Sequence, residues 1–277
     1  MPTVRNLALK FSPRVDERFK LQSVTEQATN KNYEWEGVDT VKVYSVDTVA
    51  LGNYTRSGTS RYGTPDDLGD TVQTMKVAQD KAFTYIIDKG DSASQLTVKD
   101  ANKSLKRQTD ERVIPHIDTY RLAQWVAIAT TNLAVKTLAI TKDNAFEEFL
   151  AGRKWLVNKK VPTKGRLCYA TADFINKIQL DPRFNKDSET GMKQNINGFA
   201  GKASGVTFIE VPEEYLPANV NYLLTHPIAS VAPKKLEDYK IHTKPQGVSG
   251  ALVEGRILHD CFVLEGKKNA LYVHMAA

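Results

Sequence analysis

The spacing of apolar residues changes sharply near the middle of the chain. A period-two pattern, typical of a half-buried strand, is formed by Phe83, Tyr85 and Ile87. A helical pattern with a capping-box spacing follows, and neither Gly nor Pro interrupts it before Pro115. The sequence therefore predicts a strand and then a long helix over residues 94–120, with a kink or break at the proline and helical character that resumes from Ile117 to Ala129.

The predicted helix lacks the wide apolar stripe of a core helix, because segment 106–112 contains nothing apolar. Lys106 with Asp110, and Arg107 with Glu111, have i,i+4 spacing, which contributes about 0.2–0.5 kcal/mol per pair. The segment is either a solvated helix face or the polar side of a strut that meets other subunits. The pattern leaves both interpretations open.

Three segments before this helix predict little core. Residues 1 to about 36 show almost no periodicity, so they form either a loose tail or an arm that becomes ordered on a neighbour. Residues 38–46 and 72–77 are rich in β-branched residues and flank the turn-forming segment 52–70. We expect an extended hairpin that projects from the body and lies against something else, since an isolated hairpin is marginal in water.

The rest of the chain predicts a mixed α/β region and then a β region. A helix with its stripe from Phe146 to Val157 comes first. A strand, a helix capped by Thr171 and further strands follow. The later predictions are strands at 167–170, 206–211, 221–224, 239–242, 252–258, 261–264 and 270–274, a short helix at 228–231, and a last hairpin turn at 266–269.

Composition is that of a folded, soluble chain. The 277 residues are 41% hydrophobic and 25% charged, and the net charge of +6 is spread along the sequence. A weak contact with a polyanion is compatible with this charge, whereas a domain that reads nucleic-acid sequence is not indicated. No signal peptide or membrane span is apparent. Cys168 and Cys261 lack metal-ligand partners, which indicates inert thiols in a reducing compartment.

Motifs that announce an enzyme are missing from the sequence. The glycine-rich segment 198–205 fits neither a P-loop nor a dinucleotide fingerprint, and segment 247–251 lacks the final glycine of a nucleophile elbow. His259, Asp260 and Cys261 are adjacent, but a strand would point the middle residue away from the other two. The remaining histidines, without metal-ligand spacing, are His116, His226, His242 and His274. We therefore expect a structural protein with no catalytic, cofactor-binding or metal-binding residues.

Several stretches carry a resemblance to a known family. They are DKAF with ID at 80–88, RVIPHIDTYR at 112–121, GFAGKASG at 198–205 with VP at 211–212, HPIA at 226–229, and GRI with DCFVL at 255–264. Together with the order of arm, hairpin, long helix, α/β insertion and closing β region, they resemble the major capsid proteins of tailed double-stranded DNA phages, which have the Hong Kong 97 fold. The likeness covers nearly the whole chain.

The resemblance implies an α+β fold with four parts. Residues 1–36 would be the N-terminal arm, 37–88 the E-loop hairpin, 89–134 with 233–277 the peripheral domain with its spine helix, and 135–232 the axial domain. The loop at 243–250 would meet other capsomers near threefold positions. The expected inter-subunit contacts are Tyr54, Arg56, Arg61, Tyr62, Lys106, Arg107, Asp110, Glu111, Lys244 and Gln246.

The resemblance also implies partners and a location. The chain would assemble with itself into hexamers and pentamers of a virion capsid in the host bacterial cytoplasm, with a portal protein, and would touch packaged double-stranded DNA non-specifically. Because the first predicted strand comes early, it leaves no room for a built-in scaffolding region, and we expect a separate scaffolding protein. No Lys–Asn crosslink is assigned, and no cofactor or membrane contact is expected. The alternatives are an encapsulin-type nanocompartment shell, an α/β enzyme with a site assembled in three dimensions, and a phage tail or adaptor protein.

Overall fold

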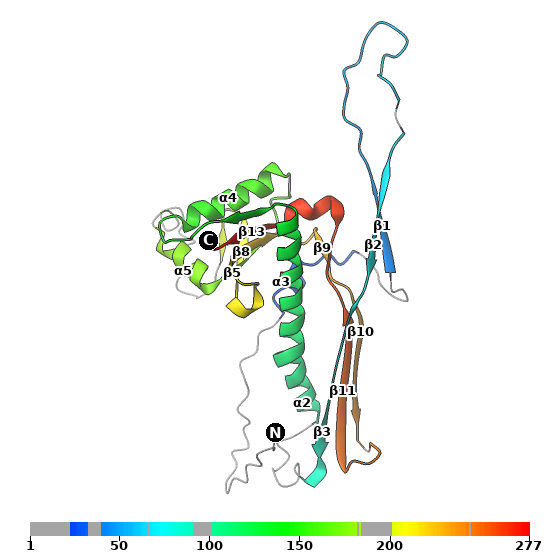
Figure 1. The fold of residues 1–277 in the computed structure, drawn as a ribbon, viewed down its shortest axis with the longest axis vertical. Coiled ribbons are helices and arrows are strands. Elements are labelled where there is room, and N and C mark those ends of the chain that lie inside the picture. The colour runs from blue at the N-terminus through cyan, green and yellow to red at the C-terminus, as the bar shows by residue number, and fades with distance from the viewer. Residues whose placement is uncertain are drawn as a thin grey trace.

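A long helix runs along the molecule, with an α/β body beside its C-terminal end and a narrow sheet along its length (Figure 1). The computed structural model describes residues 23–32, 40–65, 67–90, 101–181, 183, 201–243 and 245–277. The helix consists of α2 (Ala101–Gln108), a π-helical turn (Thr109–Val113) and α3 (Ile114–Thr131).

The helix does not break at Pro115, and it continues well past Tyr120. A proline removes one N–H from the helix and crowds the preceding turn. Here the residues just before it form the π-helical turn, in which the Ile114 N–H donates to the Thr109 carbonyl. Pro115 then lies in the first turn of α3, where a missing N–H costs little. The predicted start at Ser94 lies outside the described residues.

The narrow sheet contains three antiparallel strands in the order β10 (Lys234–His242), β11 (Gly250–His259) and β3 (Gln79–Asp88). Phe83 and Tyr85 are half-buried and Ile87 is buried, so the period-two prediction for this strand is confirmed. The β10–β11 turn lies at the end of the molecule opposite the hairpin tip (Figure 1).

The predicted hairpin is formed by β1 (Thr40–Val46) and β2 (Asp70–Lys76), in register from Thr40 opposite Lys76 to Val46 opposite Asp70. It projects beyond the rest of the molecule (Figure 1). A small apolar cluster secures its base and comprises Met75, Val77, Val231 and Leu264. The range expected for the hairpin, residues 37–88, also includes β3, but β3 pairs with β11 and not with the hairpin strands. The chain changes sheets at Ala78, whose N–H donates to Asp260 Oδ2 over 2.9 Å.

The α/β body is built on a mixed six-stranded sheet. Its order is β4 (Val135–Thr137), β13 (Tyr272–Met275), β8 (Val220–Thr225), β5 (Arg166–Thr171), β7 (Val206–Val211) and β6 (Lys202–Ala203). Helices α4 (Ala145–Asn158) and α5 (Ala172–Leu180) pack against it, as does α3. The cap on α5 is as predicted, since Thr171 Oγ1 accepts from the Phe174 N–H over 3.3 Å. The largest apolar side chains buried in this core are Trp125, Tyr169, Tyr222, Phe149 and Phe174.

Three local predictions are wrong, and in the first two long-range contacts outweigh the local pattern. Residues 228–231 form a turn and the short strand β9 (Ser230–Val231), which pairs with β12 (Phe262–Val263). The expected last hairpin turn is a 3₁₀ helix, η4 (Glu265–Ala270), between strands of different sheets. Val157 is 48% exposed and not part of the buried stripe.

The C-terminal strand has an unexpected position. β13 lies inside the six-stranded sheet, between β4 and β8, although its residues belong to the range 233–277. The last residues of 233–277, a range expected in the peripheral domain, therefore lie in the same body as most of 135–232, the range expected for the axial domain. Two further 3₁₀ turns, η1 (Glu26–Ala28) and η3 (Glu213–Tyr215), each contribute one residue to the core of this body, Ala28 and Tyr215.

Candidate inter-subunit surfaces

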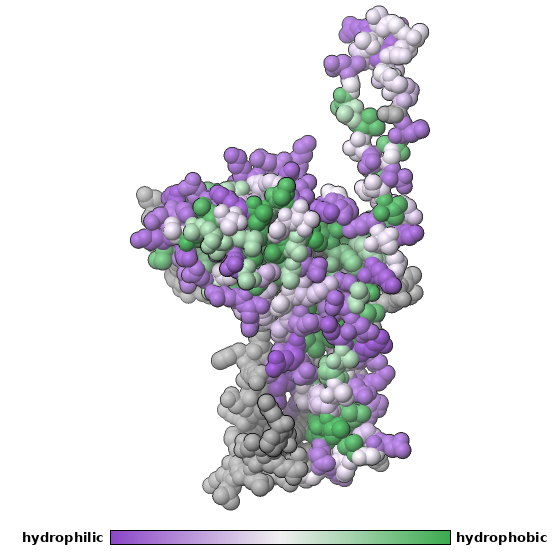
Figure 2. Space-filling view, viewed as in Figure 1, coloured by the Kyte–Doolittle hydropathy of each residue, from purple (hydrophilic) through white to green (hydrophobic). Residues whose placement is uncertain are grey.

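The hairpin, residues 40–76, leaves much of its apolar area open to solvent. Leu51 is fully exposed and Tyr62 is 92% exposed, and neither belongs to a buried cluster. Figure 2 shows apolar residues along the visible side of the hairpin between strongly polar ones. Other large apolar side chains exposed on the hairpin are Tyr44, Val46, Val49, Tyr54, Leu68 and Val72.

Contacts within the hairpin tip hold it in one local conformation. The rings of Tyr54 and Tyr62 meet edge to face, with centroids 5.0 Å apart. Arg61 closes the turn: its Nε donates to the Gly58 carbonyl over 3.1 Å, and its own carbonyl accepts from the Thr55 N–H over 3.0 Å. Arg56 is exposed. All four contact residues expected in the hairpin are thus accessible and take no part in the core.

The contact residues expected on the long helix divide into two groups. Lys106 is exposed, whereas Arg107, Asp110 and Glu111 are half-buried in the single chain. Asp110 and Glu111 lie within the π-helical turn, where the four-residue spacing of the α-helix does not apply. The i,i+4 pairing assumed from the sequence was based on an uninterrupted α-helix.

The expected loop contacts lie far from the hairpin tip. Gln246 is exposed in the turn between β10 and β11, next to Gly247, whose φ of +78° favours glycine. Lys244 lies outside the described residues. The structure therefore places the expected contacts at the hairpin tip, on the long helix and at the far end of the narrow sheet, on three separate surfaces (Figure 1).

A hydrogen-bonded clasp joins residues 23–26 to α3, and sequence reasoning missed it. The carboxylate of Asp118, which is 1% exposed, accepts from Ser23 Oγ (2.8 Å), from the Val24 N–H (2.9 Å) and from Thr25 Oγ1. Arg121, equally buried, donates to Thr25 Oγ1 and to Glu26 Oε2, each over 3.0 Å. The only signal in the sequence was a pair of charged residues on an otherwise apolar helix face.

The clasp favours the ionised form of its outer carboxylate. Burial opposes ionisation of Glu26, but the hydrogen bond from Arg121 and the charges of Lys234 and Arg121 together lower its pKa below the usual value. The segment continues into the body, where Ser230 Oγ donates to the Ala28 carbonyl over 2.8 Å. Residues 23–30 are therefore an ordered part of the fold, whereas the sequence had suggested a tail or arm throughout 1–36.

Solved structures share this architecture at low sequence identity. The structure titled as the capsid of cyanophage P-SCSP1u matches with a TM-score of 0.72 and 14% identity over 98% of this chain and 93% of that one. The asymmetric unit of the bacteriophage PhiM1 mature capsid matches with a TM-score of 0.72 and 10% identity over 98% and 92%. A structure from Mycobacterium phage Che8 gives 0.70 and 16% over 98% of both chains. The chain has the Hong Kong 97-like capsid fold.

This Hong Kong 97-like chain matches no protein-family model, and no curated protein matches its sequence. Its α+β class and its overall fold are as the sequence resemblance implied. At 10–16% identity the shared feature is the arrangement of the elements, so the surfaces described above have to be understood from this chain's own residues.

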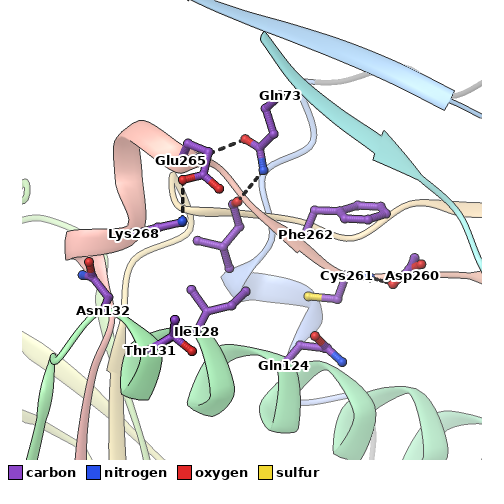
Figure 3. A pocket seen from close by; sticks show the side chains of 11 residues that line it. Gln73, Gln124, Ile128, Thr131, Asn132, Asp260, Cys261, Phe262, Glu265 and Lys268 are labelled. Atoms are coloured by element: carbon purple, nitrogen blue, oxygen red, sulfur yellow. Dashed lines mark hydrogen bonds and ion pairs between the residues drawn. The ribbon is translucent and has the colours of Figure 1, made fainter. Parts of the chain in front are cut away.

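The cavity in Figure 3 shows how this capsid-type fold holds its hairpin. It measures about 350 Å³ and lies between α3, β12 and η4. Gln73 of β2 donates to the Val263 carbonyl and accepts from the Glu265 N–H, each over 2.9 Å. Lys268 forms an ion pair with Glu265 at the same place. These contacts fix the base of the hairpin and leave its outer half free.

The His259–Asp260–Cys261 stretch does not alternate along one strand as the sequence predicted, because β11 ends at His259 and β12 begins at Phe262. Asp260 accepts from Tyr120 Oη (2.7 Å), the Ala78 N–H (2.9 Å) and the Cys261 N–H (2.8 Å), while neither ring nitrogen of His259 has a hydrogen-bond partner among the described residues. Burial raises the pKa of Cys261 to about 12, so its thiol is unreactive. Cys168 is likewise free and buried, and burial raises its pKa.

Two histidines that are far apart in the sequence meet in the fold. The rings of His116 on α3 and His259 on β11 lie edge to face with centroids 5.8 Å apart. Among the described residues, no group of three or more His, Cys, Asp or Glu is placed to hold a metal ion. None of the helices in the described part of the chain is long and apolar enough to cross a membrane.

Proposed function

We propose that this chain is the major capsid protein of a tailed double-stranded DNA phage, a structural subunit that assembles into hexamers and pentamers of an icosahedral head. The observation that supports this most directly is the hairpin, which carries a row of uncovered apolar side chains on a fold shared with phage capsid structures. Exposed apolar surface of this extent marks an interaction site.

The described part of the chain does not bury the hairpin. A two-stranded ribbon is marginal in water, and among the described residues the contacts with the rest of the molecule lie at the base of the hairpin. Covering Leu51 and Tyr62 with a neighbouring copy would remove apolar area from water at about 25 cal/mol per Å². In a closed shell each copy both gives and receives this contact, so modest interfaces add up through symmetry and multivalency.

The parts of the chain would then have distinct tasks. The arm up to residue 36 would lie along a neighbour, 37–88 would include the hairpin that overlaps the adjacent copy, the long helix and narrow sheet would form the peripheral part, and most of 135–232 would surround the capsomer centre. The contacts at Tyr54, Arg56, Arg61 and Tyr62 would belong to the overlap. Portal, scaffolding protein and non-specifically bound DNA are the further partners of this proposal, in a virion assembled in a bacterial host.

Negative-stain electron microscopy of the expressed chain, with and without its neighbouring genes, tests the proposal. We expect closed icosahedral shells, or hexameric and pentameric capsomers. Nuclease-protected DNA inside particles from a phage source separates a capsid from an encapsulin, which encloses protein cargo. Rings or tubes would indicate a tail or adaptor protein, and a dispersed monomer under every condition would contradict shell formation.

A further inference from the structure

A cavity of about 370 Å³ lies between the long helix and the narrow sheet, away from the hairpin. We call it the spine cavity, because it lies along the long helix. Its apolar lining residues are Ala82, Phe83, Val113, Ile117 and Ile257. Its polar lining consists only of groups that can donate hydrogen bonds or carry positive charge: Lys81, Gln108, Arg112, His116 and His259. No carboxylate is among these lining residues.

The cationic residues of the spine cavity come from different elements. Lys81 extends from β3, Arg112 from the π-helical turn and His116 from α3. Gln108, Arg112 and His116 all line the cavity, although the π-helical turn at Thr109–Val113 lies between the first and the last of them. Within the described part of the chain, neither Lys81 nor Arg112 forms an ion pair with a carboxylate. Three elements thus direct donors and positive charge into one space.

His259 is the buried member of this set. It is 1% exposed, it lines the cavity, and both its ring nitrogens lack a hydrogen-bond partner among the described residues. A buried polar group without a partner is costly, so a ligand that accepts from the ring would relieve that cost. The nearby Asp260 carboxylate is occupied by Tyr120, Ala78 and Cys261 and leaves the ring unpaired.

We propose that the spine cavity binds a single oxyanion of the phosphate or carboxylate type, held by the exposed side chains of Lys81, Arg112 and His116 on its open side and by the buried His259 inside. Lys81, Arg112 and His116 supply positive charge from the exposed side, and His259 supplies a buried ring that lacks a partner among the described residues. A π-helical turn at the rim is consistent with a binding role, since such turns are frequent at functional sites.

The site should bind more tightly as the pH falls. Burial lowers the pKa of His116. Burial also lowers the pKa of His259 to about 4; the positive charges of His116, Arg121 and Lys81 lower it further, and the negative charge of Asp260 opposes them. Two other titratable groups near His259 have partners of their own. Lys234, opposite His259 in the sheet, forms ion pairs with Glu26 and Glu237, and the Tyr120 hydroxyl donates to Asp260. A bound anion favours both imidazolium forms, so binding takes up protons.

Calorimetric titration of the unassembled chain with sodium sulfate, in sodium chloride of matched ionic strength, tests the proposal. Sulfate keeps its charge between pH 5.5 and 7.5, so a change in its affinity reports the protein's own groups. We expect one saturable site that is tighter at pH 5.5. Lys81→Met and Arg112→Gln should each weaken it by about tenfold or more, since a charge-assisted hydrogen bond is lost.

Lys76→Met on β2 is the matched control, because it removes the same charge from an exposed strand outside the cavity. It should bind sulfate like the wild type. A parallel titration with sodium acetate distinguishes the sources: displacement of sulfate by acetate indicates a site for protein carboxylates, and sulfate binding that acetate does not affect indicates a phosphate-type ligand.

Ring resonances of His116 and His259 provide a readout independent of folding. Sulfate should raise the titration midpoint of His116 in nuclear magnetic resonance spectra of the wild type but not of Lys81→Met. Equal effects of sulfate and chloride, or equal losses in Lys81→Met and Lys76→Met, would overturn the proposal. Because the measurement uses the unassembled chain, its outcome does not depend on whether shells form.

Discussion

Asp118 shows how much of the N-terminal order depends on single residues. Its buried carboxylate accepts three hydrogen bonds from residues 23–25, and the neighbouring Arg121 extends the network to Glu26. Apolar contacts add to this network, since Ala28 is buried in the main core cluster and Val24 packs against that cluster. The docking of residues 23–30 therefore combines buried hydrogen bonds and an ion pair with apolar packing.

Asp118→Ala should lower the free energy of unfolding by about 3 kcal/mol, because it leaves three donors, from Ser23, Val24 and Thr25, without their buried acceptor. Urea unfolding measures this loss, and limited proteolysis near residues 23–30 measures the release of the segment. Asp173→Ala is the control, since Asp173 forms only an exposed i,i+4 pair with Lys177 and its loss should cost less than about 0.5 kcal/mol. Equal losses in the two variants would contradict this account.

His259 makes stability depend on pH in a defined window. Its pKa is lowered to about 4 in the folded chain from an ordinary value of 6.5, chiefly by burial. Between these values an unfolded chain takes up a proton that the folded chain refuses, so stability falls as the pH falls from 6.5 to 4. This shift corresponds to at most about 3 kcal/mol.

His259→Gln should flatten that part of the curve of unfolding free energy against pH, measured in chloride buffers without oxyanions. The loss of stability between pH 6.5 and 4 should be smaller than in the wild type. His242→Gln serves as the control, because His242 is about half exposed and its pairing with Glu254 at the surface should contribute less than about 1 kcal/mol. The carboxylates with lowered pKa, Glu26, Asp80 and Asp181, lose their stabilising effect mainly below this window.

At the scale of elements, α4 approaches the six-stranded sheet through Gly152. A Cβ at this position would lie 2.8 Å from Tyr272 Cε1, 2.9 Å from Leu224 Cδ1 and 2.9 Å from Tyr222 Oη. These neighbours are buried, and the Tyr222 hydroxyl is held by the Glu148 carbonyl over 2.8 Å. The helix can therefore lie close to the sheet only where it has no side chain.

Gly152→Ala should destabilise the chain by up to about 2 kcal/mol, since an overpacking cost of about 1–3 kcal/mol is offset by a helix-propensity gain of about 1 kcal/mol. Thermal or urea unfolding of the unassembled chain checks this. Gly52→Ala, with nothing within 4 Å of the added atom, should change stability by less than about 0.5 kcal/mol. A stabilised Gly152→Ala protein would show that α4 can move away from the sheet.

Elements with their own local signals were predictable, and those defined by distant partners were not. The Thr171 cap and the alternation at Phe83 were enough to identify α5 and β3. β9 and η4 were mistaken because their conformations depend on pairing with β12 and on the crossing to another sheet. The surfaces followed the same rule: the exposed hairpin was predictable from its polar turn, whereas the Asp118 clasp and the His116–His259 contact require the fold.

At the scale of the whole molecule, the outer half of the hairpin contributes nothing to the folded core. Neither buried apolar cluster includes a residue from 47–69, and the described residues of this range are all exposed. The ladder of β1 and β2 remains complete up to Val46 opposite Asp70. Folding and assembly should therefore be separable by changing this segment alone.

Replacing residues 47–69 by Asn-Gly, a two-residue turn suited to a hairpin, should shift the unfolding midpoint by less than about 2 °C. The same change should abolish shells in electron micrographs under conditions where the wild type forms them. Leu51→Met is the matched control, since it keeps an apolar side chain at a fully exposed position and should still assemble. Shells of normal size from the shortened chain would contradict the proposed role of the hairpin.

The place of β13 has a consequence for the order of events during synthesis. This strand pairs with β4 on one side and β8 on the other, yet the ribosome makes it after every other strand of the sheet. Until residues 272–275 have left the ribosomal tunnel, the nascent chain has two unpaired strand edges, which can pair with other chains. Closure of the α/β body must therefore follow the release of residues 272–275 from the tunnel, and under the proposed function a subunit could meet its neighbours only after β13 is in place.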